Sequence, residues 1–280
     1  MPKKTITVPC TSSTPITRSC HNLPLDPISW QADFSDNKRI PQKWDIETWP
    51  AKKFNNELQR YTRDPSNLFT QDNHLHIRGL KNPSTQELTS ARLTTQHNQY
   101  FSYGSIHIRA RLPLQQGTWP AIWLLGKQIH HKGWPGCGEI DIMEHINTEA
   151  QIQGSAHDAG HCWKTAVKNK HFIIKVDDLT QAHDYGLTWT PDFVEWSLDG
   201  QPYGRLHKAN YVAPDQPWAY DDDQFLILNL ALGGDWPQAP NPDFEQAEMV
   251  VESIHYRPLN LKDYGLWQTQ DQQEQKQPKP

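Results

Sequence analysis

Apolar and polar residues alternate in several short segments of the chain, a pattern typical of β-strands that bury one face. The clearest of these segments are 75–78, 105–109, 193–198, 225–230 and 249–251. Asp199-Gly200 follows one of them directly and predicts a two-residue hairpin turn. Long amphipathic helical periodicity is nearly absent. Many short strands separated by Gly and Pro turns predict an all-β sandwich.

The chain divides into three parts by composition. Residues 1–27 are rich in Pro, Ser and Thr and predict an extended N-terminal arm. Residues 28–260 carry the strand patterns, and a length of 280 residues allows one large all-β domain. Residues 261–280 are expected to be a low-complexity C-terminal tail, which is Gln-rich and expected to be disordered from about Gln268.

Three carboxylates lie within one short apolar run, Glu139–Glu144. In a regular strand Glu139 and Asp141 share one face, whereas Glu144 points to the other. A β-bulge at Ile142-Met143 would shift the period by one residue and bring Glu144 beside the other two acids. The spacing therefore predicts a bulged strand with all three carboxylates on one face.

Paired carboxyl groups suit the hydrolysis of glycosidic bonds. Neighbouring like charges raise one another's pKa, which keeps one carboxyl group protonated near neutral pH. Retaining glycosidases need one ionised and one protonated carboxyl group, roughly 5–5.5 Å apart. An exposed strand with solvated acids, or an acidic calcium-binding cluster, is the alternative interpretation of the same residues. The residues that flank the acids favour the catalytic interpretation.

These flanking residues carry a family resemblance. The run 134–144, Trp-Pro-Gly-Cys-Gly-Glu-Ile-Asp-Ile-Met-Glu, closely resembles the signature of glycoside hydrolase family 16 in its laminarinase-like branch. The resemblance extends from about Trp30 to about Tyr256 and includes the segments 103–113, 117–126, 154–157, 184–192 and 228–234. It implies a β-jelly-roll sandwich of two curved antiparallel sheets with a concave cleft, a retaining mechanism and a β-glucan or related polysaccharide as substrate.

The resemblance also implies roles for the acids. Glu139 matches the nucleophile, and Glu144 matches the general acid that later acts as the base. Asp141 would hydrogen-bond Glu139 and tune the protonation of the pair, or it would only orient its neighbours. Because the three groups interact, their pKa values belong to the cluster and not to single residues.

Further residues match substrate-binding positions of the family. Trp119, Trp123 and Trp134 match tryptophans that flank the cleaved bond, and His157 matches a histidine that bonds a sugar hydroxyl or the acid. The positions that match negative subsites, where packing or loop bracing is the alternative role, are Asn56, Arg92, Tyr100 and Trp236. The chain contains 12 Trp, of which we expect about half in the core and the others available to stack on sugar rings.

No cofactor or catalytic metal is expected. A His-rich stretch surrounds the acids, but Gly154 and Gly160 disfavour the helix that would bring His157 and His161 into metal-ligand spacing. The family has a structural calcium near the chain ends. This chain has Glu252 where the family usually has Asp, and Asp33 where it often has Glu, so calcium binding is doubtful.

Composition limits the partners. The net charge of −5 and the pI near 6.3 give no basic surface for nucleic acid. The sequence contains no run of 18 apolar residues, so no membrane-spanning helix is predicted. The start of the chain lacks the apolar core of a secretory signal, so we expect a secreted or periplasmic monomer whose signal has been removed. Four cysteines allow three pairings; a Cys137–Cys162 bridge and free thiols both remain open.

The resemblance thus implies endo-hydrolysis of β-1,3-glucan by a two-glutamate mechanism. Hydrolysis of mixed-linkage β-glucan or of a marine galactan (agar, porphyran or carrageenan) is the alternative. A non-catalytic β-glucan-binding protein is the least favoured alternative, because such relatives lose the acids that this chain keeps at Glu139, Asp141 and Glu144.

Overall fold

The computed structural model describes residues 23–35, 44–164, 170–212 and 217–275, and these fold into two packed β-sheets. The ten-stranded sheet has a main path in the order β15 (Gln201–His207), β14 (Phe193–Leu198), β13 (His183–Trp189), β8 (Gly104–Arg111), β17 (Gln246–Pro258), β5 (His74–Lys81), β6 (Leu88–Ser90) and β3 (Gln59–Tyr61). Two further strands extend it, β1 (Trp30–Gln31) beside β17 and β4 (Leu68–Gln71) beside β5. Among these neighbours only β3 and β6 run parallel.

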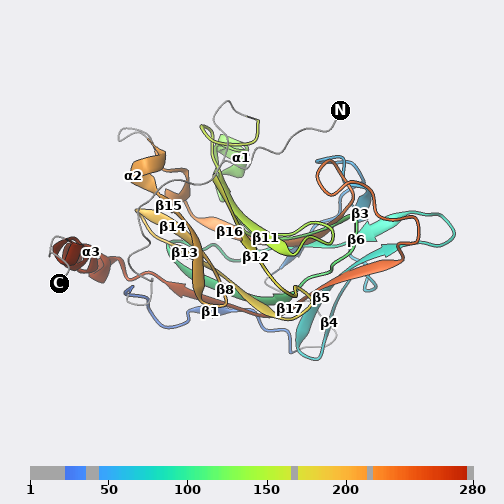
Figure 1. Cartoon of the computed structure of the whole chain (residues 1–280), viewed down its shortest axis with the longest axis horizontal. Coiled ribbons are helices and arrows are strands. Elements are labelled where there is room, and N and C mark those ends of the chain that lie inside the picture. The colour runs from blue at the N-terminus through green and yellow to red at the C-terminus, as the bar shows by residue number, and fades with distance from the viewer. Residues whose placement is uncertain (1–22, 36–43, 165–169, 213–216, 276–280) are drawn as a thin grey trace.

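The second sheet has seven strands and carries the acidic run. Its order is β12 (Lys170–Lys175), β11 (Gln151–His157), β10 (Glu139–Glu144), β9 (Thr118–Gly126), β16 (Gln224–Leu232), β7 (Arg92–Thr94) and β2 (Asp45–Ile46). Figure 1 shows β16, β11 and β12 of this sheet above β8 and β17 of the ten-stranded sheet. The expected all-β sandwich is confirmed, and each strand-like segment of the sequence lies in β5, β8, β14, β16 or β17.

The core lies between the two sheets and follows the alternation in the sequence. Ile106 and Ile108 of β8 and Ile140 and Ile142 of β10 are all buried in one apolar cluster. Full burial of each such side chain contributes about 1.5–3 kcal/mol. The opposite face of the seven-stranded sheet carries polar and aromatic side chains. We call it the acidic face, because Glu139, Asp141 and Glu144 of β10 lie on it.

The hairpin turn expected at Asp199-Gly200 is confirmed. Leu198 of β14 pairs directly with Gln201 of β15, so the loop has two residues. Both residues have positive φ angles, 50° at Asp199 and 75° at Gly200. This conformation matches the right-handed twist of the paired strands and explains why Asp-Gly is favoured there.

Four helices complete the described residues: α1 (Ile129–Lys132), α2 (Lys208–Tyr211), the 3-10 helix η2 (Ala219–Asp221) and α3 (Leu261–Gln275). Helix α3 covers residues 261–275 of the segment expected to be a low-complexity tail, including positions from Gln268 onward where disorder was expected. Its Tyr264 is only 4 % exposed, packs with Leu23, Phe193 and Leu259, and donates a 2.8 Å hydrogen bond to Asp192. Straight-chain residues such as Gln have good helix propensity, and the buried tyrosine supplies the tertiary contact that composition alone does not reveal.

The N-terminal arm mostly lies outside the described residues. Within 23–27, Leu25 forms a β-bridge with Leu259, so this end of the arm runs beside the end of β17. Helix α3 and this segment meet in one small apolar cluster on the ten-stranded sheet.

Substitution of Gly154, which lies in β11 next to β10, tests the packing between the two sheets. A Cβ at this position would overlap the indole ring of Trp196 and lie 2.8 Å from Tyr203 Oη. We expect Gly154→Ala to lower the free energy of unfolding by about 1–3 kcal/mol, because the buried ring of Trp196 and the partly buried ring of Tyr203 would both have to move. Urea denaturation measures the change.

The matched control is Gly265→Ala in α3, where an added Cβ meets no atom within 4 Å. We expect this variant to be as stable as the parent or more stable by up to about 1 kcal/mol, because alanine favours helix. Equal stability of the two variants would contradict the packing described here.

Candidate active site

The site is built on a bulge in β10. Along β9, Asp141 pairs with Trp123, but Met143 pairs with Ile122, so β10 contains one extra residue between these positions. The register against β11 shifts between Asp141 and Glu144 in the same way. The bulge predicted from the sequence is confirmed. It places Glu144 on the acidic face together with Asp141.

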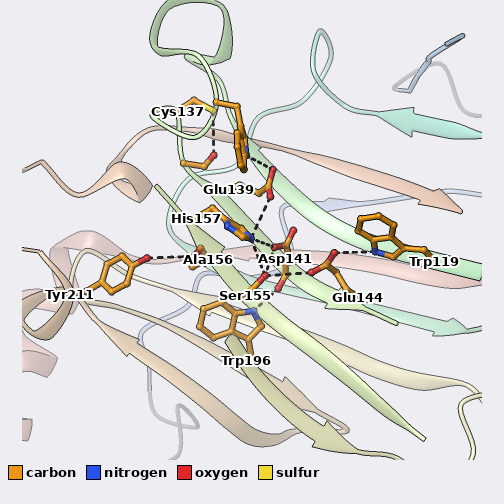
Figure 2. A network of polar contacts seen from close by, with 12 residues as sticks. Trp119, Cys137, Glu139, Asp141, Glu144, Ser155, Ala156, His157, Trp196 and Tyr211 are labelled. Carbon is orange, nitrogen blue, oxygen red and sulfur yellow. Dashed lines mark hydrogen bonds and ion pairs between the residues drawn. The ribbon is translucent and has the colours of Figure 1, made fainter. Parts of the chain in front are cut away.

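Indole groups hold the two glutamates from opposite ends of the strand. Trp134 Nε1 donates a 3.0 Å hydrogen bond to Glu139 Oε2, and Trp119 Nε1 donates a 3.1 Å hydrogen bond to Glu144 Oε1. Figure 2 shows the carboxylates of Glu139 and Glu144 on either side of Asp141, with the indole of Trp119 pointing toward Glu144. Each glutamate is therefore oriented by one rigid, uncharged donor.

Asp141 lies at the centre of the network and is only 5 % exposed. Its carboxylate accepts a hydrogen bond from the Ser155 hydroxyl of β11. The Ser155 hydroxyl also lies 3.5 Å from Glu144 Oε2. The backbone oxygen of Asp141 accepts a 2.7 Å hydrogen bond from Trp196 Nε1, which rises from the core. Asp141 is thus held both by its side chain and by its main chain.

His157 joins the carboxylates. Its Nε2 lies 3.2 Å from Asp141 Oδ2 and 3.8 Å from Glu139 Oε1. The sequence left two partners open for this histidine, a sugar hydroxyl or an acid. The structure brings it to Asp141 and Glu139.

Burial shifts the pKa values of both glutamates upward. Removal from water, followed by the charge of Asp141, raises the pKa of Glu139 to about 8, against the opposing effects of His157, Trp134 and Arg92. Burial and Asp141 also raise the pKa of Glu144 well above its ordinary value. A carboxyl group that keeps its proton near neutral pH is the requirement for a general acid.

The pKa of His157 is shifted by opposing effects. Burial lowers it, but the hydrogen bond to Asp141 and the charges of Asp141, Glu139 and Glu144 outweigh burial and raise it to about 9. The imidazole is therefore protonated at neutral pH, and its positive charge favours ionisation of the neighbouring carboxyl groups.

Aromatic side chains line the acidic face around the acids. Tyr100, Trp123 and Trp134 pack on one small apolar cluster formed by β9, β16 and Cys137. Trp119 meets Trp236 edge to face at 5.2 Å. The structure thus brings four of the predicted binding residues close to the catalytic strand: Trp119, Trp123, Trp134 and His157.

Arg92 packs against aromatic rings, which is the alternative role that the sequence left open for it. Its guanidinium lies 4.4 Å from the ring of Trp49 and 4.6 Å from the ring of Trp123, and its Nε bonds Glu47. The residue is 8 % exposed. Because its guanidinium lies against two indole rings, its direct effect is to hold Trp123 in place.

Other contacts extend this side of the face. Trp123 Nε1 donates a 2.8 Å hydrogen bond to Asn229 Oδ1. Asn56 is exposed and donates a 2.8 Å hydrogen bond to Asp235, next to Trp236. Trp49 and Asn229 were not singled out from the sequence; a lone polar residue within the apolar run of β16 was the available signal for Asn229.

The donor sets fit metal ions poorly. Glu139, Asp141 and His157 offer ligand atoms within 4.8 Å of one another, the one such group among the described residues. In the structure, His157 Nε2 lies 3.2 Å from Asp141 Oδ2 and 3.8 Å from Glu139 Oε1, so the three side chains form an ion-pair cluster. At the doubtful calcium positions, Glu252 already bonds Arg109 and Arg111, and Asp33 is exposed and accepts from Ser35 N at 2.9 Å.

Two remaining expectations concern cysteines and membranes. Cys137 and Cys162 are both buried, and no bond joins them in the structure; Cys10 and Cys20 lie outside the described residues. Within the described part of the chain, we find no helix with the length and apolar character needed to cross a membrane.

Two partly buried, indole-bonded glutamates that share one face of a β-sandwich with an aromatic surface form the arrangement that hydrolysis of a glycosidic bond requires. The model of glycosyl hydrolases family 16 matches residues 43–249, and the chain belongs to this family.

Relatives with known names support this assignment. The chain is 34 % identical over 224 residues to a beta-glucanase of Rhodothermus marinus, covering 76 % of this chain and 78 % of that one. It is 33 % identical over 223 residues to a glucan endo-1,3-beta-glucosidase of Cryptopygus antarcticus, covering 75 % and 81 %. The X-ray structure of the laminarinase from Rhodothermus marinus superposes with a TM-score of 0.78 at 32 % identity, covering 84 % of this chain and 98 % of that one.

The charge of His157 predicts a change in pH dependence. The positive charge of His157 lowers the pKa values of Glu139 and Glu144. His157→Gln removes this charge, so both pKa values should rise. Activity that depends on ionised Glu139 increases as pH rises through its pKa, so the acidic limb of kcat/KM should move to higher pH. Initial rates from pH 4 to pH 10 measure the shift.

At the pH where the parent enzyme is half-active on its acidic limb, we expect the rate of the variant to be about fivefold lower than that of the parent, which corresponds to a pKa rise of roughly one unit. An acidic limb that stays in place or moves to lower pH would show that His157 does not control the ionisation of the site. His183→Gln, which removes a histidine paired with Asp199 away from the acids, is the matched control.

Proposed function

We propose that the protein is a retaining endo-β-1,3-glucanase that uses Glu139 as nucleophile and Glu144 as general acid and base. The observation that carries the proposal is the bulge in β10, which puts both carboxyl groups and Asp141 on one face. The printed names of the relatives supply the substrate class. A retaining pair needs its carboxyl groups roughly 5–5.5 Å apart.

In the first step, Glu139 attacks the anomeric carbon and forms a covalent glycosyl-enzyme. The bond to the leaving oxygen breaks, and Glu144 gives that oxygen its proton. The raised pKa of Glu144 keeps this proton available near neutral pH. Glu139 must be ionised to attack, and His157 and the Trp134 indole favour its ionised form.

In the second step, water replaces the glycosyl ester. Glu144, now a carboxylate, removes a proton from water as the oxygen attacks the anomeric carbon, and Glu139 leaves as a carboxylate. Ser155 contacts Glu144 as well as Asp141 and so links the base to the central acid. Both glutamates return to their starting protonation states.

The aromatic surface around the acids favours a neutral sugar polymer. Trp119, Trp123 and Trp134 offer apolar ring faces that suit the C–H faces of pyranose rings. Their indole N–H groups already donate hydrogen bonds to Glu144, Asn229 and Glu139, which fixes the orientation of the rings. A polymeric substrate is met outside the cytoplasm, which supports a secreted or periplasmic enzyme. We propose that it acts as a monomer.

The substrate assignment predicts a ranked activity profile. We expect endo-cleavage of laminarin, lower activity on lichenan, and none on agarose or carrageenan. A reducing-sugar assay on equal masses of the four polysaccharides, with product sizes followed over time, measures the profile. Agarose cleavage without laminarin cleavage would overturn the substrate and leave the mechanism in place.

The nucleophile assignment predicts chemical rescue. Glu139→Ala should lower kcat by at least about 10⁴-fold, because no covalent intermediate can form. Azide should restore part of the activity and give a glycosyl azide of inverted configuration at the anomeric carbon. Product NMR and a thermal melt of the variant give the two readouts.

A folded Glu139→Ala variant that keeps more than a few per cent of the parent rate without azide would exclude Glu139 as nucleophile. Glu149→Ala, which removes an exposed carboxylate from the loop after β10, is the matched control and should keep the parent rate.

A further inference from the structure

Trp163 is an exposed tryptophan close to the catalytic strand. It lies in the loop that follows β11, and 54 % of it is exposed. Among the described residues, only Trp236 is also classed as an exposed tryptophan, at 39 %. Contiguous exposed apolar patches mark binding surfaces, whereas single exposed apolar side chains are ordinary, so the contacts of Trp163 decide its role.

Ring contacts connect Trp163 to the nucleophile. Its ring centroid lies 6.4 Å from that of Trp134, with the two planes tilted by 43°. Trp134 in turn donates its hydrogen bond to Glu139 and lies 6.1 Å from the ring of His157. The two indoles therefore form a continuous aromatic surface that begins at Glu139 and leads outward.

Lys164 adds a charge to this surface. Its ammonium lies 4.7 Å from the ring of Trp163 and 5.0 Å from the ring of Trp134. Cation–π attraction to both rings holds the indoles together. The Trp163 ring and the Lys164 ammonium thus place an apolar ring face beside a hydrogen-bond donor, a combination that suits a pyranose ring with its hydroxyl groups.

The order of strands places this surface on one side of the catalytic strand. β11 and β12 lie on one side of β10, whereas β9, β16 and β7 lie on the other. Arg92, from β7, and the Asn56–Asp235 pair belong to the latter side, which resembles the negative subsites. Trp163 follows β11, which borders β10 on the side opposite to Arg92, and we assign the leaving part of the substrate to this side.

We infer that Trp163, held by Lys164, binds a neutral glucosyl residue in the leaving part of the chain, beyond the sugar that carries the leaving oxygen. This inference rests on the proposed function. It makes Trp163 a determinant of chain length: substrates that extend past the cleaved bond gain binding energy there, whereas substrates with a short leaving group do not.

Two substrates separate this role from catalysis. Laminarihexaose extends on both sides of the cleaved bond, whereas 4-nitrophenyl β-laminaritrioside has only a nitrophenol as its leaving group. Trp163→Ala should lower kcat/KM on the hexaose about five- to tenfold, mainly through KM, and leave the nitrophenyl substrate within about twofold of the parent. Trp163→Phe should restore most of the loss on the hexaose.

Leu266→Ala, which truncates an apolar residue on α3 that is 65 % exposed, is the control and should change neither substrate. Equal kinetics of parent and Trp163→Ala on the hexaose would overturn the inference, and so would an equal loss on both substrates, because the latter would mean that Trp163 acts through Trp134. A parent enzyme that cleaves neither substrate would instead refute the proposed function.

The neutral character of the sugar is tested with Lys164→Gln. We expect less than about a threefold change on laminarihexaose, since the indole face carries most of the binding. A parent preference for a sulfated or carboxylated glucan that Lys164→Gln removes would show that the surface selects an anionic substituent and would overturn the assignment to a neutral sugar.

Discussion

The extra residue in β10 sets where Glu144 lies relative to Glu139 and Asp141. Without a bulge, the alternation of a strand would send Glu144 to the core side, where Ile140 and Ile142 pack. With it, three carboxyl groups share one face and the apolar residues of the same strand still fill the core. The strand therefore serves packing and chemistry at once.

Placing three acids so close together in a poorly solvated site is unfavourable unless each finds partners. The structure supplies these from several elements: an indole for each glutamate, and the Ser155 hydroxyl and the His157 imidazolium for Asp141. These partners offset only part of the cost of ionising the three carboxyl groups. The pKa values of Glu139 and Glu144 therefore remain raised, and a general acid depends on a raised pKa.

Much of this could be predicted from the sequence, because the signals were local. Strand alternation, the Asp199-Gly200 turn and the bulge all depend on residues a few positions apart. The pairing of His157 with Asp141 and the stacking of Arg92 between Trp49 and Trp123 depend on strand register between distant segments, which periodicity does not contain. Helix α3 was missed for a related reason: its Gln-rich composition indicates disorder, whereas the buried Tyr264 anchors it through tertiary contacts.

The stereochemistry of the reaction tests the account most directly, because it depends on how the bulge spaces Glu139 and Glu144. Proton NMR during the first minutes of laminarin hydrolysis, before mutarotation, identifies the anomer that the enzyme releases. The account predicts that the β-anomer appears first and the α-anomer grows in later, as expected for two displacements through a glycosyl-enzyme. Initial release of the α-anomer would mean a single displacement by water and would contradict the assignment of Glu139 as the nucleophile.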